Sequence, residues 1–142
     1  MVADTNVVTE FMRDRPDPHV LTWAASIPPA SLAVTVVTVE EIERGLGRLR
    51  DGRRRQDLAA RWRRLVDQYA DAILTYDVPA ARATAAVLVH REATGRPMGL
   101  ADAQIAGICL NAGLTLATRN VRDFEDVPGL DVIDPFGTSD AS

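Results

Sequence analysis

The chain has 142 residues, of which 46% are hydrophobic and 25% are charged, so composition predicts one globular domain. We expect that domain to span residues 1–136 and a flexible C-terminal tail to follow over 137–142. The net charge of −4 does not favour a nucleic-acid partner for the protein as a whole, so any such binding must be local.

Residue usage excludes several reaction classes. The single cysteine, Cys109, rules out a disulfide within the chain and a cysteine-based zinc cluster. All 16 basic residues are arginine, so neither a Schiff-base lysine nor a P-loop lysine is present. No apolar run approaches the roughly 20 residues that span a bilayer, and the N-terminus carries no secretory pattern. We therefore expect a cytoplasmic protein.

The first third of the chain predicts two strands separated by helices. Residues 1–4 suit a short buried strand that ends in an acid, and residues 7–12 suit a helix. Asp17-Pro18 places proline at the first position of a second helix, which continues to Pro28-Pro29. Residues 31–37 are apolar and mostly β-branched, which is typical of a strand buried on both faces.

The remaining residues predict a helical hairpin and then further strands and helices in alternation. Apolar residues recur at helical spacing on either side of a turn at Asp51-Gly52. The predicted elements are helices over 38–50 and 53–70, a strand over 72–76, helices over 79–94 and 100–111, and strands over 114–118 and 130–133. Because parallel strands need helical crossovers, this order predicts an α/β sandwich around a parallel sheet.

Three carboxylates occupy comparable places in this pattern. Asp4 ends the first strand, Glu41 follows the second, and Asp102 lies in the first turn of the helix before the fourth. In parallel sheets ligands bind beyond the carboxyl ends of the strands, so these acids could converge. An all-oxygen cluster of this kind suits Mg²⁺ or Mn²⁺.

Each acid also has a purely structural interpretation. Asp4 could cap the following helix, and Asp102 would be favourable near any helix N-terminus. Thr38 and Glu41 match a capping box, while Glu40 and Glu43 are rival candidates for the same role as Glu41.

Four ordered motifs extend this pattern over most of the chain: Asp4-Thr5-Asn6-Val7, Thr38-Val39-Glu40-Glu41-Ile42 with Gly45, Asp102-Ala103-Gln104-Ile105-Ala106, and Leu116-Ala117-Thr118-Arg119-Asn120-Val121-Arg122-Asp123-Phe124. Together they resemble the PIN-domain ribonucleases, specifically the VapC toxins of toxin–antitoxin pairs, nearest their FitB-like branch. The resemblance implies a three-layer α/β/α sandwich around a five-stranded parallel sheet, with a protruding helical hairpin. It also implies that Asp4, Glu41 and Asp102 are the catalytic acids and hold one or two Mg²⁺ or Mn²⁺ ions, Glu41 directly or through water.

The family pattern selects Glu41 over its neighbours, because Ile42 follows it and Gly45 lies four positions on. Many PIN nucleases carry a fourth aspartate where this chain has Asn120, which leaves Asn120 and Asp123 as secondary candidates. Thr5 and Asn6 resemble residues that orient Asp4 or a metal-bound water, although helix capping explains Thr5 equally well.

Nine arginines and only two acids fall between residues 44 and 64, which gives this segment a local charge of +7. Such a surface could hold RNA phosphates, dock a partner helix or be merely solvated. In the resembling family this region often contributes to antitoxin binding. The candidates for RNA or antitoxin contact are Arg48, Arg53, Arg54 and Arg55.

The resemblance therefore predicts the toxin of a toxin–antitoxin pair, a metal-dependent endoribonuclease in which a metal-activated water attacks the phosphodiester. It implies an RNA substrate, a VapB-like antitoxin and a homodimer. A catalytically weak PIN fold that binds RNA or protein is the alternative, because Asn120 stands at the fourth site. A phosphatase that uses Asp4 as nucleophile is disfavoured, because Asn6 stands where a second aspartate would be needed.

Overall fold

The computed structural model describes residues 1–137, and the tail predicted over 137–142 lies outside these residues except for Gly137. Its five strands are β1 (Val2–Ala3), β2 (Val34–Thr35), β3 (Ile73–Leu74), β4 (Leu116–Ala117) and β5 (Val132–Ile133). All paired strands run parallel, in a ladder β1-β4-β5 and a ladder β2-β3. A parallel bridge between Val2 and Ala33 joins the two ladders, so the strand order is β3-β2-β1-β4-β5.

Seven α-helices and two 3-10 turns connect these strands in the described part of the chain. The α-helices are α1 (Thr5–Phe11), α2 (Pro18–Ala25), α3 (Val36–Gly47), α4 (Arg53–Gln68), α5 (Val78–Ala93), α6 (Leu100–Ala112) and α7 (Val121–Phe124). The 3-10 turns are η1 (Pro29–Ser31) and η2 (Ala70–Ala72). None of the helices in residues 1–137 is both long enough and apolar enough to cross a membrane.

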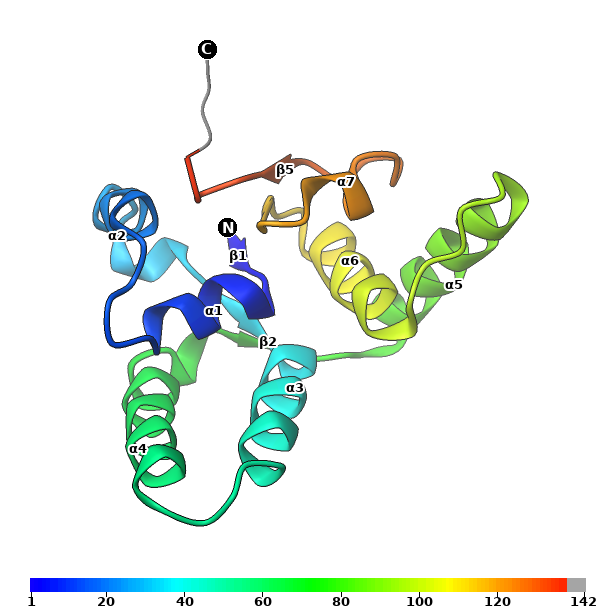
Figure 1. Cartoon of the computed structure of the whole chain (residues 1–142). Coiled ribbons are helices and arrows are strands. Elements are labelled where there is room, and N and C mark those ends of the chain that lie inside the picture. Colours follow the sequence, from blue (N-terminus) through cyan, green and yellow to red (C-terminus); the bar gives the residue numbers. More distant parts are fainter. Residues whose placement is uncertain (138–142) are drawn as a thin grey trace.

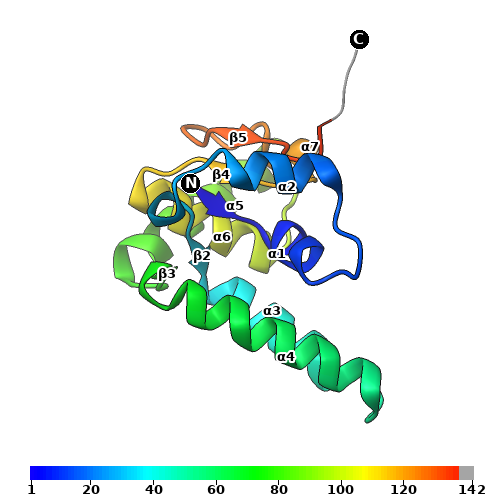
Figure 2. The same cartoon turned by 90° about the vertical axis from the view of Figure 1, so that its left-hand side faces the viewer.

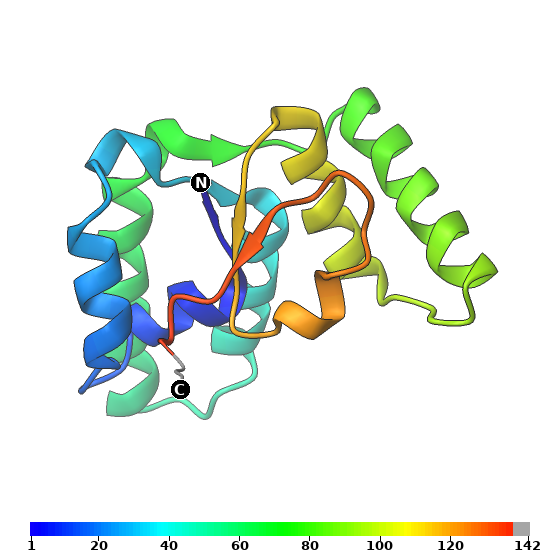
Figure 3. The same cartoon turned by 90° about the horizontal axis from the view of Figure 1, so that it is seen from above.

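The helices cover both faces of the sheet and create two apolar cores. Figures 1 and 3 show α5 and α6 on one side of the strands and α1, α2 and α4 on the other. Because side chains alternate along a strand, Val2 enters the core beneath α5 and α6 while Ala3 enters the core beneath α1 and α4. The predicted three-layer sandwich is therefore confirmed.

The predicted hairpin is also present. Helices α3 and α4 extend away from the sheet side by side and are joined by a turn at residues 48–52 (Figures 1 and 2). Trp62 of α4 is buried and donates a hydrogen bond from Nε1 to Glu43 of α3, which ties the two helices together.

The boundary between the second strand and the hairpin differs from the prediction. The strand predicted over 31–37 is confined to β2, because Val36 and Val37 already belong to α3. The helix is capped by Thr35, whose hydroxyl accepts a hydrogen bond from the backbone N–H of Thr38 at 3.1 Å. The predicted capping box between Thr38 and Glu41 is therefore wrong. Because Glu41 does not cap the helix, its carboxylate is available for another partner.

Candidate functional site

Asp4 lies where β1 meets α1, at the carboxyl edge of the sheet. It is 4% exposed and caps α1 by accepting the backbone N–H of Thr5 on Oδ1 at 2.8 Å. Its Oδ2 accepts a 2.7 Å hydrogen bond from the hydroxyl of Thr118. Burial raises the pKa of Asp4, with smaller contributions from the charges of Glu41 and Asp123, while the hydrogen bonds oppose the rise. Capping thus accounts for one carboxylate oxygen only.

Thr118 is a site residue that the sequence reasoning did not single out. It is fully buried and follows β4 as Asp4 follows β1. Its hydroxyl accepts hydrogen bonds from Asn6 Nδ2 at 3.3 Å and from the backbone N–H of Asn120 at 3.1 Å while it donates to Asp4. The signal that could have found it is its place directly after a buried strand next to β1.

Glu41 enters the same region from the second turn of α3. Its Oε1 accepts a 2.6 Å hydrogen bond from the hydroxyl of Thr5, which also contacts the hydroxyl of Thr38 at 3.0 Å. The rival acids have different partners: Glu43 accepts from Trp62, and the carboxylate of Glu40 lies 3.9 Å from Arg44 at the surface. Only Glu41 among the three is thus joined to the segment that carries Asp4.

Asp102 lies in the first turn of α6 and is half-buried. Burial, followed by the charges of Asp4, Glu41 and Asp123, raises its pKa to about 6, and Arg91 opposes this only weakly. Because these charges come from three separate segments, the fold brings Asp4, Glu41, Asp102 and Asp123 within electrostatic reach of one another.

The chemistry of these side chains fits a hard divalent cation. All four donors are carboxylates, and two of them resist ionisation because of burial and mutual repulsion, which a cation between them would relieve. Within residues 1–137, however, no three histidine, cysteine, aspartate or glutamate side chains form a ready-made ligand group. The acids thus lie within electrostatic reach of one another, but no three of them lie close enough together to form a ligand group.

The fourth position is occupied by an exposed amide. Asn120 precedes α7, a short helix that the sequence reasoning did not predict, and its side chain makes no capping hydrogen bond there. Asn6, the other polar residue of the first motif, accepts the backbone N–H of Arg119 on Oδ1 at 3.1 Å. Asn6 therefore fixes the strand end from which Asn120 and Asp123 follow.

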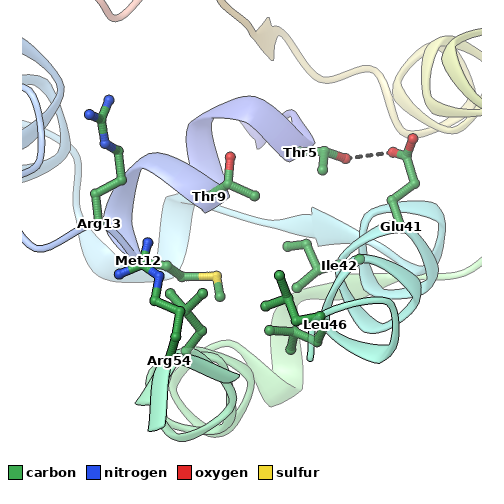
Figure 4. Close-up of a pocket in the computed structure, with 11 residues that line it drawn as sticks. Thr5, Thr9, Met12, Arg13, Glu41, Ile42, Leu46 and Arg54 are labelled. Carbon is green, nitrogen blue, oxygen red and sulfur yellow. Dashed lines mark hydrogen bonds between the residues drawn. The ribbon is translucent and has the colours of Figure 1, made fainter. Parts of the chain in front are cut away.

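An apolar groove of about 290 Å³ opens next to Glu41, between α1, α3 and α4 (Figure 4). Ile42 and Leu46 line one side of it and Met12 the opposite side, while Arg13 and Arg54 lie at the end away from Glu41. Its remaining lining residues are Thr5, Thr9, Gly45, Leu49 and Leu58. The groove is thus continuous with the acidic site at one end and basic at the other.

The arginines of the hairpin differ in their surroundings. Arg55 pairs with Asp51 at 2.8 Å and so braces the turn between α3 and α4. Arg54 and Arg61 both reach Asp14, at 3.7 and 2.6 Å, and link α4 to the end of α1. Arg48 and Arg53 have no ion pair among the described residues. All four candidate arginines stay predictions for contact with an outside partner.

Comparison with known proteins places this arrangement in a family. A model of the PIN domain matches residues 1–130. The chain is 34% identical to the plasmid stability protein StbB of Pseudomonas syringae and 32% identical to the VapC ribonuclease Y4jK of Sinorhizobium fredii, covering 96% of the chain in both cases and 98% and 97% of those relatives.

Two further similarities concern Neisseria gonorrhoeae. The toxin FitB is 29% identical over 87% of this chain and 90% of its own length. The crystal structure of FitAcB superposes with a TM-score of 0.88 at 28% identity and covers 96% of this chain and 99% of that one. The acids at the sheet edge are those of the motifs that resemble PIN-domain proteins, and the PIN-domain model matches residues 1–130. This chain therefore belongs to the PIN-domain family.

Proposed function

We propose that this protein is the toxin of a toxin–antitoxin pair and an endoribonuclease that requires Mg²⁺ or Mn²⁺. The observation that carries the proposal is the convergence of Asp4, Glu41 and Asp102 from three segments. Thr5, next to Asp4, hydrogen-bonds to Glu41, and the charges of Asp4 and Glu41 both raise the pKa of Asp102. The relatives named VapC ribonuclease and toxin FitB support the same activity. An RNA substrate also implies that the protein acts in the cytoplasm.

In this proposal Asp4 and Asp102 hold the cation, with Glu41 binding it directly or through water. A bound divalent cation would lower the pKa of an attacking water and offset the charge that develops on the phosphate. Thr118 and Thr5 keep Asp4 and Glu41 in fixed orientations through hydrogen bonds of 2.7 and 2.6 Å. With water as the nucleophile and the 3′ oxygen as the leaving group, the products should carry a 5′-phosphate and a 3′-hydroxyl.

The test is cleavage of purified total RNA by antitoxin-free protein in Mg²⁺, Mn²⁺ or EDTA. Asp4→Ala, Glu41→Ala and Asp102→Ala should abolish the discrete fragments that appear with metal. Glu40→Ala is the matched control, because it removes an adjacent carboxylate that is 74% exposed and whose one ion pair within residues 1–137 is with Arg44. A 2′,3′-cyclic phosphate at the fragment ends would contradict the proposal, and RNA binding without cleavage would favour the binding-module alternative.

A small VapB-like antitoxin is the partner that the groove beside Glu41 fits. An apolar helix or extended segment could cover Leu46 and Leu49 there and carry a basic side chain toward the acids. FitAB and VapBC complexes are among the structures that share this fold. Leu46→Glu should prevent binding of a VapB-like antitoxin and leave RNA cleavage by the free toxin intact.

A homodimer is the expected assembly, and the exposed face of α5 offers a surface for it. Val78 and Val89 are 61% and 65% exposed and lie three helical turns apart, so both point from one side of the helix. Leu100 at the start of α6 is also 61% exposed. Val89→Glu should convert the dimer to a monomer in sedimentation velocity, whereas an unchanged sedimentation coefficient would exclude this face.

A further inference from the structure

Next to the acidic site, a guanidinium group lies on an aromatic ring. The guanidinium of Arg119 is 4.0 Å from the ring centroid of Phe136. Phe136 is 7% exposed within the core beneath α1 and α4, and its backbone N–H donates to Asp134 Oδ1 at 2.8 Å. Arg119 is exposed, and its backbone N–H is held by Asn6. The buried ring of Phe136 therefore supports one face of the guanidinium, while the Arg119 side chain remains accessible to solvent.

This pair borders a surface depression of about 450 Å³, lined by Arg119, Asn120, Val121, Arg122, Asp123 and Asp134. Two arginines and two aspartates give the lining no net charge, so it is not an anion site like a phosphate pocket. It offers a flat cationic surface, an aliphatic side chain and the amide of Asn120, a combination that suits a neutral planar group with polar edges.

The depression lies close to the acids of the candidate metal site. Asn120 donates its backbone N–H to the Thr118 hydroxyl, which in turn donates to Asp4. Asn6 also joins the depression to the acids, because its side chain accepts the backbone N–H of Arg119 and donates to the Thr118 hydroxyl. A strand whose phosphate lies at these acids would thus have a neighbouring nucleotide within reach of Arg119. Phe136 lies beyond the part of the chain that the PIN-domain model matches, so the shared family features do not account for this support.

We propose that the depression is a nucleotide subsite, in which the base of a single-stranded RNA nucleotide beside the scissile bond stacks on the Arg119 guanidinium. Phe136 would hold the guanidinium plane in place, and Asn120 would contact the polar edge of the base. The inference rests on the proposed endoribonuclease function and adds a specificity-determining contact to it.

The test compares RNA binding by wild type, Arg119→Lys and Arg119→Ala in EDTA, where cleavage is prevented. The probe is a fluorescein-labelled single-stranded RNA of mixed sequence and about 12 nucleotides, followed by fluorescence anisotropy. Lysine keeps the charge but loses the planar surface, so both variants should bind about tenfold more weakly than wild type. Arg82→Met is the matched control, because Arg82 is an exposed arginine far from the candidate metal site. It lies near the start of α5, where Asp77 contacts Asn111 at the C-terminal end of α6, whereas Asp102 lies at the N-terminal end of α6.

A second series replaces one nucleotide at a time by an abasic residue. Wild type should bind the RNA more weakly when the base at one particular position is removed. For Arg119→Lys, removal of the same base should leave the affinity unchanged. Wild-type affinity in Arg119→Lys, or no sensitive position, would overturn the subsite. Loss of antitoxin binding with RNA binding unchanged would assign the surface to the protein partner instead. If wild type neither binds nor cleaves RNA in the presence of metal, the endoribonuclease proposal itself fails. If wild type cleaves RNA with metal but substitution of Arg119 leaves RNA binding unchanged, only the nucleotide subsite is excluded.

Discussion

The hydroxyl of Thr5 donates a 2.6 Å hydrogen bond to Oε1 of Glu41 and thereby ties the start of α1 to the second turn of α3. Asp4 precedes Thr5 directly, so this bond sets the position of one candidate ligand relative to another.

Thr5→Val should therefore lower the rate of RNA cleavage about tenfold or more, the usual cost of losing a residue that orients a metal ligand. Thr5→Ser keeps the hydroxyl and should retain most of the activity. Initial cleavage rates at saturating Mg²⁺ measure both variants. Equal rates for Thr5→Val and wild type would show that Glu41 does not depend on this bond.

Thr118→Val should affect both stability and activity. The substitution is close in shape but removes the hydroxyl that donates to Asp4 and accepts from Asn6 and Asn120. Because Thr118 is fully buried, water cannot replace these bonds, and we expect a loss of about 1–3 kcal/mol in the free energy of unfolding. Urea denaturation measures the loss, and Thr118→Ser should recover most of it. A Thr118→Val variant that is as stable as wild type but inactive would show that Thr118 orients Asp4 without contributing to stability.

Asp102 should make the metal-free protein sensitive to pH. Its pKa in the folded protein is about 6, above the value of roughly 4 for an unfolded chain. The folded state thus holds a proton that the unfolded state releases, so this contribution to stability is present below about pH 4 and lost as the pH rises through 6.

Asp102→Asn should consequently raise the unfolding temperature in EDTA near pH 7.5 and change it little near pH 4. Mg²⁺ should stabilise wild type at neutral pH more than it stabilises the variant. Thermal unfolding at the two pH values measures this, with Asp71→Asn, an exposed carboxylate elsewhere, as control. A variant with the pH profile of wild type would contradict the expectation.

Arg91 holds the segment that carries Asp123. It is 4% exposed, donates from Nη1 to the backbone carbonyl of Asp123 at 2.8 Å and lies 3.6 Å from Asp126. Oδ1 of Asp126 is buried and has no hydrogen-bond partner in residues 1–137. Arg91→Met should therefore cost about 1–3 kcal/mol of stability, because it removes a buried donor from the backbone carbonyls of Arg96 and Asp123.

Arg96→Met is the matched comparison for Arg91→Met. Arg96 pairs with the same aspartate at 2.8 Å, but its side chain is 47% exposed, so its loss should cost less than about 1 kcal/mol. Denaturant unfolding of both variants distinguishes a buried cation from a surface one. Equal losses would mean that burial does not set the importance of Arg91.

Gly107 allows α5 and α6 to pack closely. A Cβ atom there would lie 2.1 Å from Thr84 Oγ1 and 2.8 Å from the carbonyl oxygen of Ala80. Gly107→Ala must push the helices apart and should lower the free energy of unfolding by about 1–3 kcal/mol. Gly47→Ala, where a Cβ meets nothing within 4 Å, should instead leave stability unchanged or slightly raised. A larger loss of stability for Gly47→Ala than for Gly107→Ala would exclude tight packing at Gly107.

Local signals in the sequence located most of the helices. Asp17 caps α2 with Pro18 at its first position, and Gly113 ends α6 in the left-handed conformation, as the residue types predict. These features depend on the backbone of a few neighbouring residues, so they can be read without knowledge of the fold. The family motifs likewise marked Asp4, Glu41 and Asp102 as candidates, and the structure brings their charges together.

The start of α3 and the role of Thr118 could not be read in this way. Val36 and Val37 have the β-branched character of a strand, yet the cap at Thr35 and burial of Val37 in the core place them in a helix. Thr118 matters because β1 and β4 are neighbours in the sheet, although 114 residues separate Asp4 from Thr118 along the chain.

The sequence by itself determined the alternation of strands and helices, most of the helix ends and the acids available for a metal, because each follows from side-chain types and short-range spacing. The tertiary structure alone decided which glutamate meets Thr5, which hydroxyl orients Asp4 and that Arg119 lies on Phe136. These contacts join residues that are distant in the chain, and only strand order and helix packing bring them within hydrogen-bonding or van der Waals distance.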